Sequence, residues 1–192
     1  MKKRFKKIKA RIWMKIISVF SLSIIFTLVS CQNNTKQTYH TTITSVYDGD
    51  TFYDDFNTYR LFGVDTPELK TDSILNSGLQ GKYALEATNL SKKVLINQKI
   101  SITKISVDPY KRIVAKVITQ NDDLAKILLS KGLAIVKYFN LEKGSLYHYD
   151  DEPYFNELLK VQSQAIKTKS GFWKLGIEKM ALIFPKHQNI FK

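Results

Sequence analysis

The chain has 192 residues, the length of one ordinary domain with a short appendage. Its 30 Lys and Arg residues against 17 Asp and Glu residues give a net charge of +13, which favours polyanions or anionic lipid as partners. Cys31 is the single cysteine, which excludes an internal disulfide, so the fold must be held by its hydrophobic core.

The N-terminal segment is first basic and then apolar. Eight of the basic residues and none of the acidic ones precede Cys31, and an apolar run follows over residues 16–29. This pattern predicts a secretory signal peptide over residues 1–30. Without that peptide, 22 basic and 17 acidic residues remain, so the exported protein would carry a net charge of +5.

Residues 28–31 read LVSC, which resembles a bacterial lipobox whose cysteine receives diacylglycerol and becomes the new N-terminus. We therefore expect Cys31 to be lipidated and the protein to be anchored in the cell membrane on its extracellular face. An uncleaved N-terminal anchor helix is the alternative, and both place the domain outside the membrane. Residues 31–39 are expected to be a polar, lipidated tether, with the folded part beginning near His40.

Five segments have the composition and alternation of β-strands. They are residues 41–47, 51–53, 58–64, 99–107 and 112–119. The first two flank Asp48-Gly49-Asp50, a strong turn signal between strands.

Three segments place apolar residues at helical spacing. They are residues 81–96, residues 122–131, and a third that starts at Asp151 and ends before Gly171. Strands first, with helices inserted late and at the end, predict an α+β fold: a five-stranded OB-type antiparallel β-barrel with about three helices. We place this domain at residues 40–175 and treat residues 176–192 as a C-terminal tail.

Four short pieces carry the reactive side chains: residues 48–51 (DGDT), Arg60, residues 65–68 (DTPE) and residues 108–112 (DPYKR). Phosphodiester hydrolysis needs positive charge on the phosphoryl group and a base for the attacking water. Calcium prefers carboxylate and carbonyl oxygens, and the arginine fork matches phosphate. Taken singly, each piece is more simply a hairpin turn, a helix entrance or a solvated arginine.

Taken together and in this order, the pieces resemble the staphylococcal nuclease family. The family's DGDT turn stands at residues 48–51, its R-L-x-x-V-D-T-P-E block at residues 60–68, and its D-x-Y-x-R element at residues 108–112. The resemblance covers about residues 40–173. It implies an OB-type barrel and calcium-dependent hydrolysis of DNA and RNA at the bond to the 5′ oxygen, which leaves 3′-phosphate products.

The resemblance also implies the metal ligands. Asp50 and Asp65 correspond to carboxylate ligands of one calcium ion, the backbone carbonyl of Thr66 to a further ligand, and Asp48 to an outer carboxylate. Two carboxylates, one carbonyl and waters suit calcium better than zinc. The chain has no cysteine cluster, and its scattered histidines are expected at the surface: His40, His148 and His187.

The reacting groups follow from the same resemblance. Glu68 corresponds to the residue that orients or deprotonates the attacking water, and Arg60 and Arg112 correspond to the pair that holds the phosphoryl oxygens. Tyr110 and Tyr138 are expected to stack on bases or to contact the adjacent phosphate.

One spacing resists this assignment. Arg60 and Asp65 are five residues apart, so strict strand alternation would place them on opposite faces. A bend or bulge at Gly63 would bring both into one site.

Two other functions remain open. A non-catalytic OB module could bind single-stranded nucleic acid at the cell surface, although binding alone does not need Glu68. A structural or adhesive lipoprotein would explain the tether and the charge, but not five reactive side chains in family order.

Overall fold

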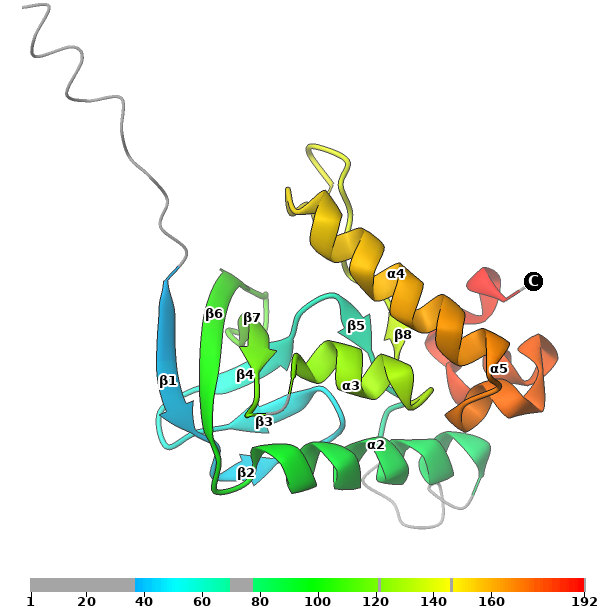
Figure 1. Ribbon diagram of the computed structural model, residues 1–192, viewed down its shortest axis with the longest axis horizontal. Coiled ribbons are helices and arrows are strands. Elements are labelled where there is room, and N and C mark those ends of the chain that lie inside the picture. Colours follow the sequence, from blue (N-terminus) through cyan, green and yellow to red (C-terminus); the bar gives the residue numbers. More distant parts are fainter. Residues whose placement is uncertain (1–36, 70–77, 121, 146, 192) are drawn as a thin grey trace, which may run out of the picture. The chain divides into compact units, whose positions relative to one another are not determined.

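Six strands form one sheet in the order β1-β6-β7-β4-β3-β2 (Figure 1). The computed structural model describes residues 37–69, 78–120, 122–145 and 147–191, all within the unit Lys36–Lys192. The strands of this sheet are β1 (Thr38–Thr42), β2 (Ser45–Val46), β3 (Thr51–Tyr53), β4 (Thr58–Leu61), β6 (Lys99–Val107) and β7 (Ile113–Ile118).

The sheet curls because its two edges belong to one stretch of chain. β1 and β2 lie at opposite ends of the strand order, yet only Ile43 and Thr44 separate them in the sequence. Ile43 is fully buried, and Thr44 N–H donates to Tyr53 O at 2.9 Å. The chain therefore passes from pairing with β6 to pairing with β3 within two residues.

The predicted α+β fold with an OB-type curled sheet is confirmed. Neighbouring strands are antiparallel except β4 and β7, which run parallel. The single strand predicted at residues 41–47 is divided into β1 and β2, since the same segment must pair with two different partners.

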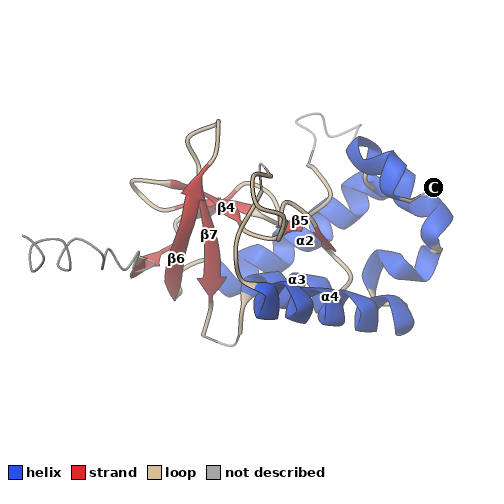
Figure 2. Cartoon of the chain, turned by 90° about the horizontal axis from the view of Figure 1, so that it is seen from above, coloured by secondary structure: helices blue, strands red, loops and turns tan. Residues whose placement is uncertain are grey.

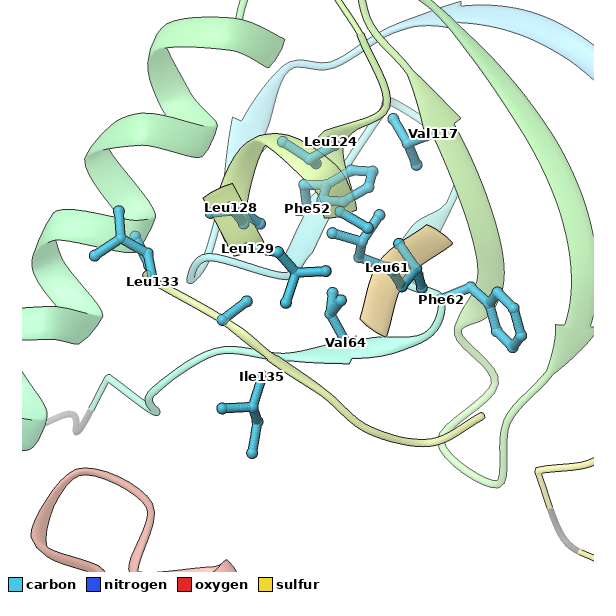
Figure 3. Packing of buried hydrophobic residues seen from close by; sticks show 14 of the residues in the cluster. Phe52, Leu61, Phe62, Val64, Val117, Leu124, Leu128, Leu129, Leu133 and Ile135 are labelled. Atoms are coloured by element: carbon cyan, nitrogen blue, oxygen red, sulfur yellow. The ribbon is translucent and has the colours of Figure 1, made fainter. Parts of the chain in front are cut away.

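Alternate residues of the strands fill the inside of the curl. Ala115 and Val117 of β7 are fully buried, as the two-residue period of a strand requires. Figure 3 shows Val117 and Phe52 from the sheet beside Leu124 from a helix that covers it. Burying a side chain of the size of Leu or Phe contributes about 1.5–3 kcal/mol. This core, without any disulfide, holds the strands that carry the charged residues.

The three predicted helices are present as α2 (Leu79–Leu95), α3 (Leu124–Ser130) and α4 (Glu152–Lys167). Two of them begin after an aspartate cap. Asp123 Oδ1 accepts Ala125 N–H at 2.8 Å, and Asp151 Oδ1 accepts Tyr154 N–H at 3.2 Å. Figure 2 shows the helices gathered beside the strands of the large sheet, as in other α+β domains.

The C-terminal segment is folded. Residues 176–192, which the sequence analysis sets apart as a tail, contribute Met180, Ile183 and Phe184 to the buried core. The ring of Phe184 packs edge-on against Phe172, with 5.4 Å between centroids. The elements here are η2 (Gly171–Leu175), η3 (Ile177–Lys179), α5 (Met180–Ile183) and η4 (Pro185–Ile190).

The predicted signal peptide, Cys31 and the tether as far as residue 36 lie outside the described residues. β1 begins at Thr38, so the last two residues of the predicted tether 31–39 belong to the sheet. In the part of the chain that the structure describes, no helix is both long enough and apolar enough to cross a membrane.

Candidate active site

The turn between β2 and β3 carries the first acidic residues. Asp48 Oδ1 accepts Asp50 N–H at 3.1 Å, which shapes the turn. Gly49 is pressed against α2, because a Cβ at this position would lie 2.7 Å from Ala87 Cβ. Ser91 Oγ donates to Gly49 O at 2.6 Å. Glycine is therefore required for close approach to α2, and this contact fixes the position of Asp50.

Arg60 and Asp65 meet because the chain bends after β4. Gly63 has φ +81°, in the left-handed region, and β5 (Val64–Asp65) follows. Arg60 Nη2 donates to Asp65 Oδ1 at 2.5 Å, and Nη1 donates to the carbonyls of Leu61 and Val64 at 2.9 Å each. The bend expected at Gly63 is present and resolves the conflict with strand alternation.

β5 pairs with β8 (Ile135–Val136), a strand that the sequence analysis did not predict. Two residues are too few to show a period in the sequence. Asp65 lies opposite Ile135, and Lys137 N–H donates to Gly63 O at 3.0 Å. This pairing holds the backbone on both sides of the bend.

Asp50 reaches the residue that follows β5. Its Oδ2 accepts Thr66 N–H at 2.7 Å and the Thr66 hydroxyl at 2.9 Å, while its Oδ1 lies 3.3 Å from Arg60 Nη1. Asp50, Asp65 and Thr66 are all exposed by 5% or less. The structure thus brings the three residues proposed for calcium together around one guanidinium.

The buried carboxylates outnumber the cation that pairs with them. Burial raises the pKa of Asp48 to about 7, and the neighbouring Asp50 adds to the effect. Burial also raises the pKa of Asp50, against the opposing attraction of Arg60. With Asp65 in the same cluster, a single guanidinium faces three acids, and a divalent cation would offset this surplus of negative charge.

The donor atoms are hard oxygens, which calcium prefers. Across the described ranges, no three His, Cys, Asp or Glu side chains are placed to hold a metal ion among themselves. Asp50, Asp65 and the Thr66 backbone could thus supply only part of a calcium shell, with water supplying the rest. Calcium would share their carboxylate oxygens with Arg60, Thr66 and His187 or displace these donors.

Glu68 lies at the edge of a cavity of about 260 Å³. Asp65, Thr66 and Glu68 line it together with residues 183–187. Gln80 Nε2 donates to Glu68 O at 3.0 Å, and the Glu68 side chain is 43% exposed. A base at this position is open to water, unlike the buried aspartates.

Two C-terminal residues contact the predicted site. Lys186 Nζ lies 2.8 Å from Glu68 Oε1, and His187 Nε2 lies 2.9 Å from Asp65 Oδ2. Because a carboxylate only accepts, His187 Nε2 carries the proton in this bond. The His187 side chain is 9% exposed, so the expectation that this histidine lies at the surface is wrong.

No motif marks Lys186 or His187 in the sequence, since they contact acids 118 and 122 residues away. A weaker signal does exist. Met180, Ile183 and Phe184 are apolar at positions i, i+3 and i+4, which indicates a buried face just before these two residues.

Arg112 immediately precedes β7 and pairs with Asp108. Its Nε donates to Asp108 Oδ2 at 2.7 Å, and Asp108 Oδ1 accepts the backbone N–H groups of Tyr110 and Arg112 at 2.9 Å. In the parallel pairing of β4 with β7, Arg60 lies opposite Val114. Arg112 is two residues before Val114, so its backbone lies close to β4, the strand that carries Arg60.

The two tyrosines predicted to contact nucleic acid each lie against the guanidinium of a different arginine. The Arg60 Cζ lies 5.5 Å from the Tyr138 ring centroid, and the Arg112 Cζ lies 5.3 Å from that of Tyr110. Burial raises the pKa of Tyr138 to about 12, with Asp65 adding to the effect. Tyr110 is 80% exposed, so its ring face is open to a base, whereas Tyr138 is packed into the cluster.

The chain is similar to a known protein family and to a protein from a yeast. Residues 58–175 match the family described as staphylococcal nuclease homologue. The match covers more than half of the chain and includes Arg60, Glu68 and Arg112, but it begins after Asp50 and ends before Lys186. "Probable endonuclease LCL3" of Komagataella phaffii is 32% identical over 125 residues, which is 62% of this chain and 49% of that protein. The chain therefore spans about half the length of this relative.

Proposed function

Because the chain belongs to the family of staphylococcal nuclease homologues, we propose that it is a calcium-dependent nuclease that hydrolyses phosphodiester bonds of DNA and RNA. The observation that carries the proposal is Arg60 held between Asp50 and Asp65, with Glu68 at the edge of the adjoining cavity. The guanidinium of Arg60 matches the shape of a phosphate group, and the carboxylates of Asp50 and Asp65 can bind calcium. Glu68 adds a carboxylate that can act as a base on water.

Asp50, Asp65 and the Thr66 carbonyl are the groups that would hold calcium. When bound, the ion would offset the negative charge that develops on the phosphoryl oxygens. Arg60 contributes in a different way. Its guanidinium is fixed by two carbonyls and the aspartates before substrate arrives, which is the preorganisation that electrostatic stabilisation requires.

In the proposed reaction, a water oxygen attacks phosphorus and Glu68 takes the proton. The bond from phosphorus to the 5′ oxygen breaks, the leaving 5′ oxygen takes a proton from solvent water, and the phosphate remains on the 3′ side. Arg60 and Arg112 hold the phosphoryl oxygens during attack. Glu68 must first release Lys186, but this ion pair is exposed and its loss costs no more than about 1 kcal/mol.

The proposal includes export and lipid anchoring through Cys31, with the nuclease domain on the extracellular face of the cell membrane. The support is the basic head, the apolar run and the LVSC sequence at residues 28–31. The tether would then join the membrane to β1 at Thr38.

The decisive experiment measures the release of acid-soluble nucleotides from DNA and from RNA, with calcium and with EDTA. We expect both substrates to be degraded in calcium and neither in EDTA. Glu68→Gln should lower turnover by a factor on the order of 100 or more, whereas the exposed Glu178→Gln should not change it. Binding of nucleic acid without any cleavage in calcium would instead support the non-catalytic module.

Calcium binding has its own test. Asp50→Asn and Asp65→Asn each remove a formal charge from the proposed ligand set, so calorimetry should show a loss of calcium affinity of at least about tenfold. Asp55→Asn, at an exposed turn, is the matched control. Unchanged affinity in both site variants would show that calcium binds elsewhere or is not used.

A further inference from the structure

The C-terminal side of the cavity is held rigidly by packing. Met180 and Ile183 are fully buried, and Phe184 packs its ring against Phe172. Pro185 then fixes the backbone direction at the start of η4. The residues that follow are therefore positioned by the core of the domain.

His187 sets the orientation of this segment against the acidic side of the cavity. Its bond to Asp65 is almost completely shielded, with side-chain exposures of 9% and 8%. The His187 ring also stacks on Phe184 and contacts Tyr138, at centroid distances of 6.4 Å and 5.9 Å. With His187 fixed in this way, the preceding residue, Lys186, faces Glu68.

The Lys186 contact differs from the His187 contact in its exposure. Lys186 is 66% exposed and Glu68 is 43% exposed, so their ion pair is open to solvent and weak. The hydrogen bond that Lys186 donates to Glu68 raises the pKa of Lys186, which is therefore a cation at neutral pH. An anion that enters the cavity can replace Glu68 as its partner at little cost.

Nucleic acid that binds here needs such a cation. A phosphate beside Glu68 and Asp65 meets negative charge from these carboxylates. Arg60 and Arg112 are assigned to the phosphate that is cut, so a neighbouring phosphate needs a cation of its own. Residues 183–187 line the same cavity and Lys186 contacts Glu68 directly, so a strand placed at Glu68 lies close to this segment.

We propose that residues 183–187 form the second wall of the nucleic-acid site, and that Lys186 binds a strand phosphate next to the one that is cut. This inference rests on the proposed nuclease function. It assigns substrate binding to a segment that lies beyond the region matching the family.

The test is binding of a fluorescent single-stranded oligonucleotide by the full chain in detergent micelles with EDTA, measured by anisotropy from about 50 to 200 mM salt. Lys186→Gln should raise the Kd about three- to tenfold and lower the slope of log Kd against log salt by about 0.7, the loss of one phosphate contact. Lys186→Arg should keep both values. Lys179→Gln removes the same charge from an exposed position that does not line the cavity, and should also keep both.

Kinetics in calcium supply the second readout. Lys186→Gln should raise KM and change kcat by no more than about twofold, as loss of uniform binding does. A parental Kd and salt slope in Lys186→Gln would overturn the inference. An increase in kcat/KM would also overturn it, because the segment would then be a block on Glu68. If the parental chain binds the oligonucleotide but does not cleave it, the nuclease function fails and the binding comparison still decides the role of Lys186.

Discussion

Arg60 is the residue around which the candidate site is organised. Its guanidinium donates to Asp65 and to the carbonyls of Leu61 and Val64, and it lies 3.3 Å from Asp50. These acceptors fix the plane of the guanidinium group. A lysine ammonium at the same place has no such plane and could not donate in the same directions. Arg112 is fixed less completely, by one aspartate in a turn.

This difference predicts distinct kinetics for the two arginines. Arg60→Lys and Arg112→Lys should each lower turnover by a factor on the order of 100, because each loses an oriented donor to developing charge. The loss in Arg112→Lys should fall mainly on kcat, whereas Arg60→Lys should also raise KM. Steady-state cleavage of a short oligonucleotide at saturating calcium measures both, after circular dichroism has confirmed folding. Near-parental turnover in both variants would mean that the proposed site is wrong.

The raised pKa of the buried Asp48 predicts an unusual dependence of protein stability on pH. Its pKa is about 7 in the folded chain against 3.8 without the fold, so between these values the folded state binds more protons than the unfolded state. The contribution of Asp48 to stability therefore falls as pH rises through that window. In EDTA, the parental protein should lose more thermal stability from pH 5 to pH 8 than Asp48→Asn does. Equal losses would show that burial does not raise the pKa of Asp48.

At the scale of elements, the sequence predicts best those segments whose periodicity is long. Strands at residues 99–107 and 113–118 and all three main helices are recovered to within a few residues. β8 was missed because its two residues are defined by pairing with β5, a tertiary contact. The break at Ile43 was missed for a related reason, since it depends on which strands lie on either side.

The bend between β4 and β5 should make the stability of the fold sensitive to substitution of Gly63. Gly63→Ala should cost about 1–2 kcal/mol through the left-handed φ, and more because the new Cβ would lie 2.9 Å from Leu158 Cδ1. Gly144→Ala is a matched control, since its φ is +88° with nothing within 4 Å. Urea unfolding should show the larger loss in Gly63→Ala, and cleavage should fall only there. Equal losses would show that the bend tolerates a side chain.

For the whole molecule, the candidate site is assembled from distant parts of the sequence. The motifs at residues 48–68 and 108–112 could be recognised because each is a short continuous stretch of sequence. In the curled sheet, the pairing of β4 with β7 brings the two stretches close to each other. The sequence did not predict that residues 183–187 line the cavity, because their position depends on where the buried Met180 and Ile183 pack. Local sequence thus points to the proposed reacting groups, whereas the position of residues 183–187 depends on tertiary packing.

The proposed lipid anchor would decide where the whole molecule acts. We predict that the exported chain begins at Cys31 carrying diacylglycerol, as the LVSC sequence indicates. Each buried CH₂ contributes about 0.8 kcal/mol, so two acyl chains give stable anchoring where one chain is only marginal. Mass spectrometry of membrane-extracted protein should find lipid on Cys31, and Cys31→Ser should no longer mature at this position. Its nuclease activity should survive in detergent, because the described fold begins at Thr38, beyond the lipid site. An N-terminus at Met1, or a Cys31→Ser protein that matures and partitions into detergent like the parent, would instead support the uncleaved anchor helix.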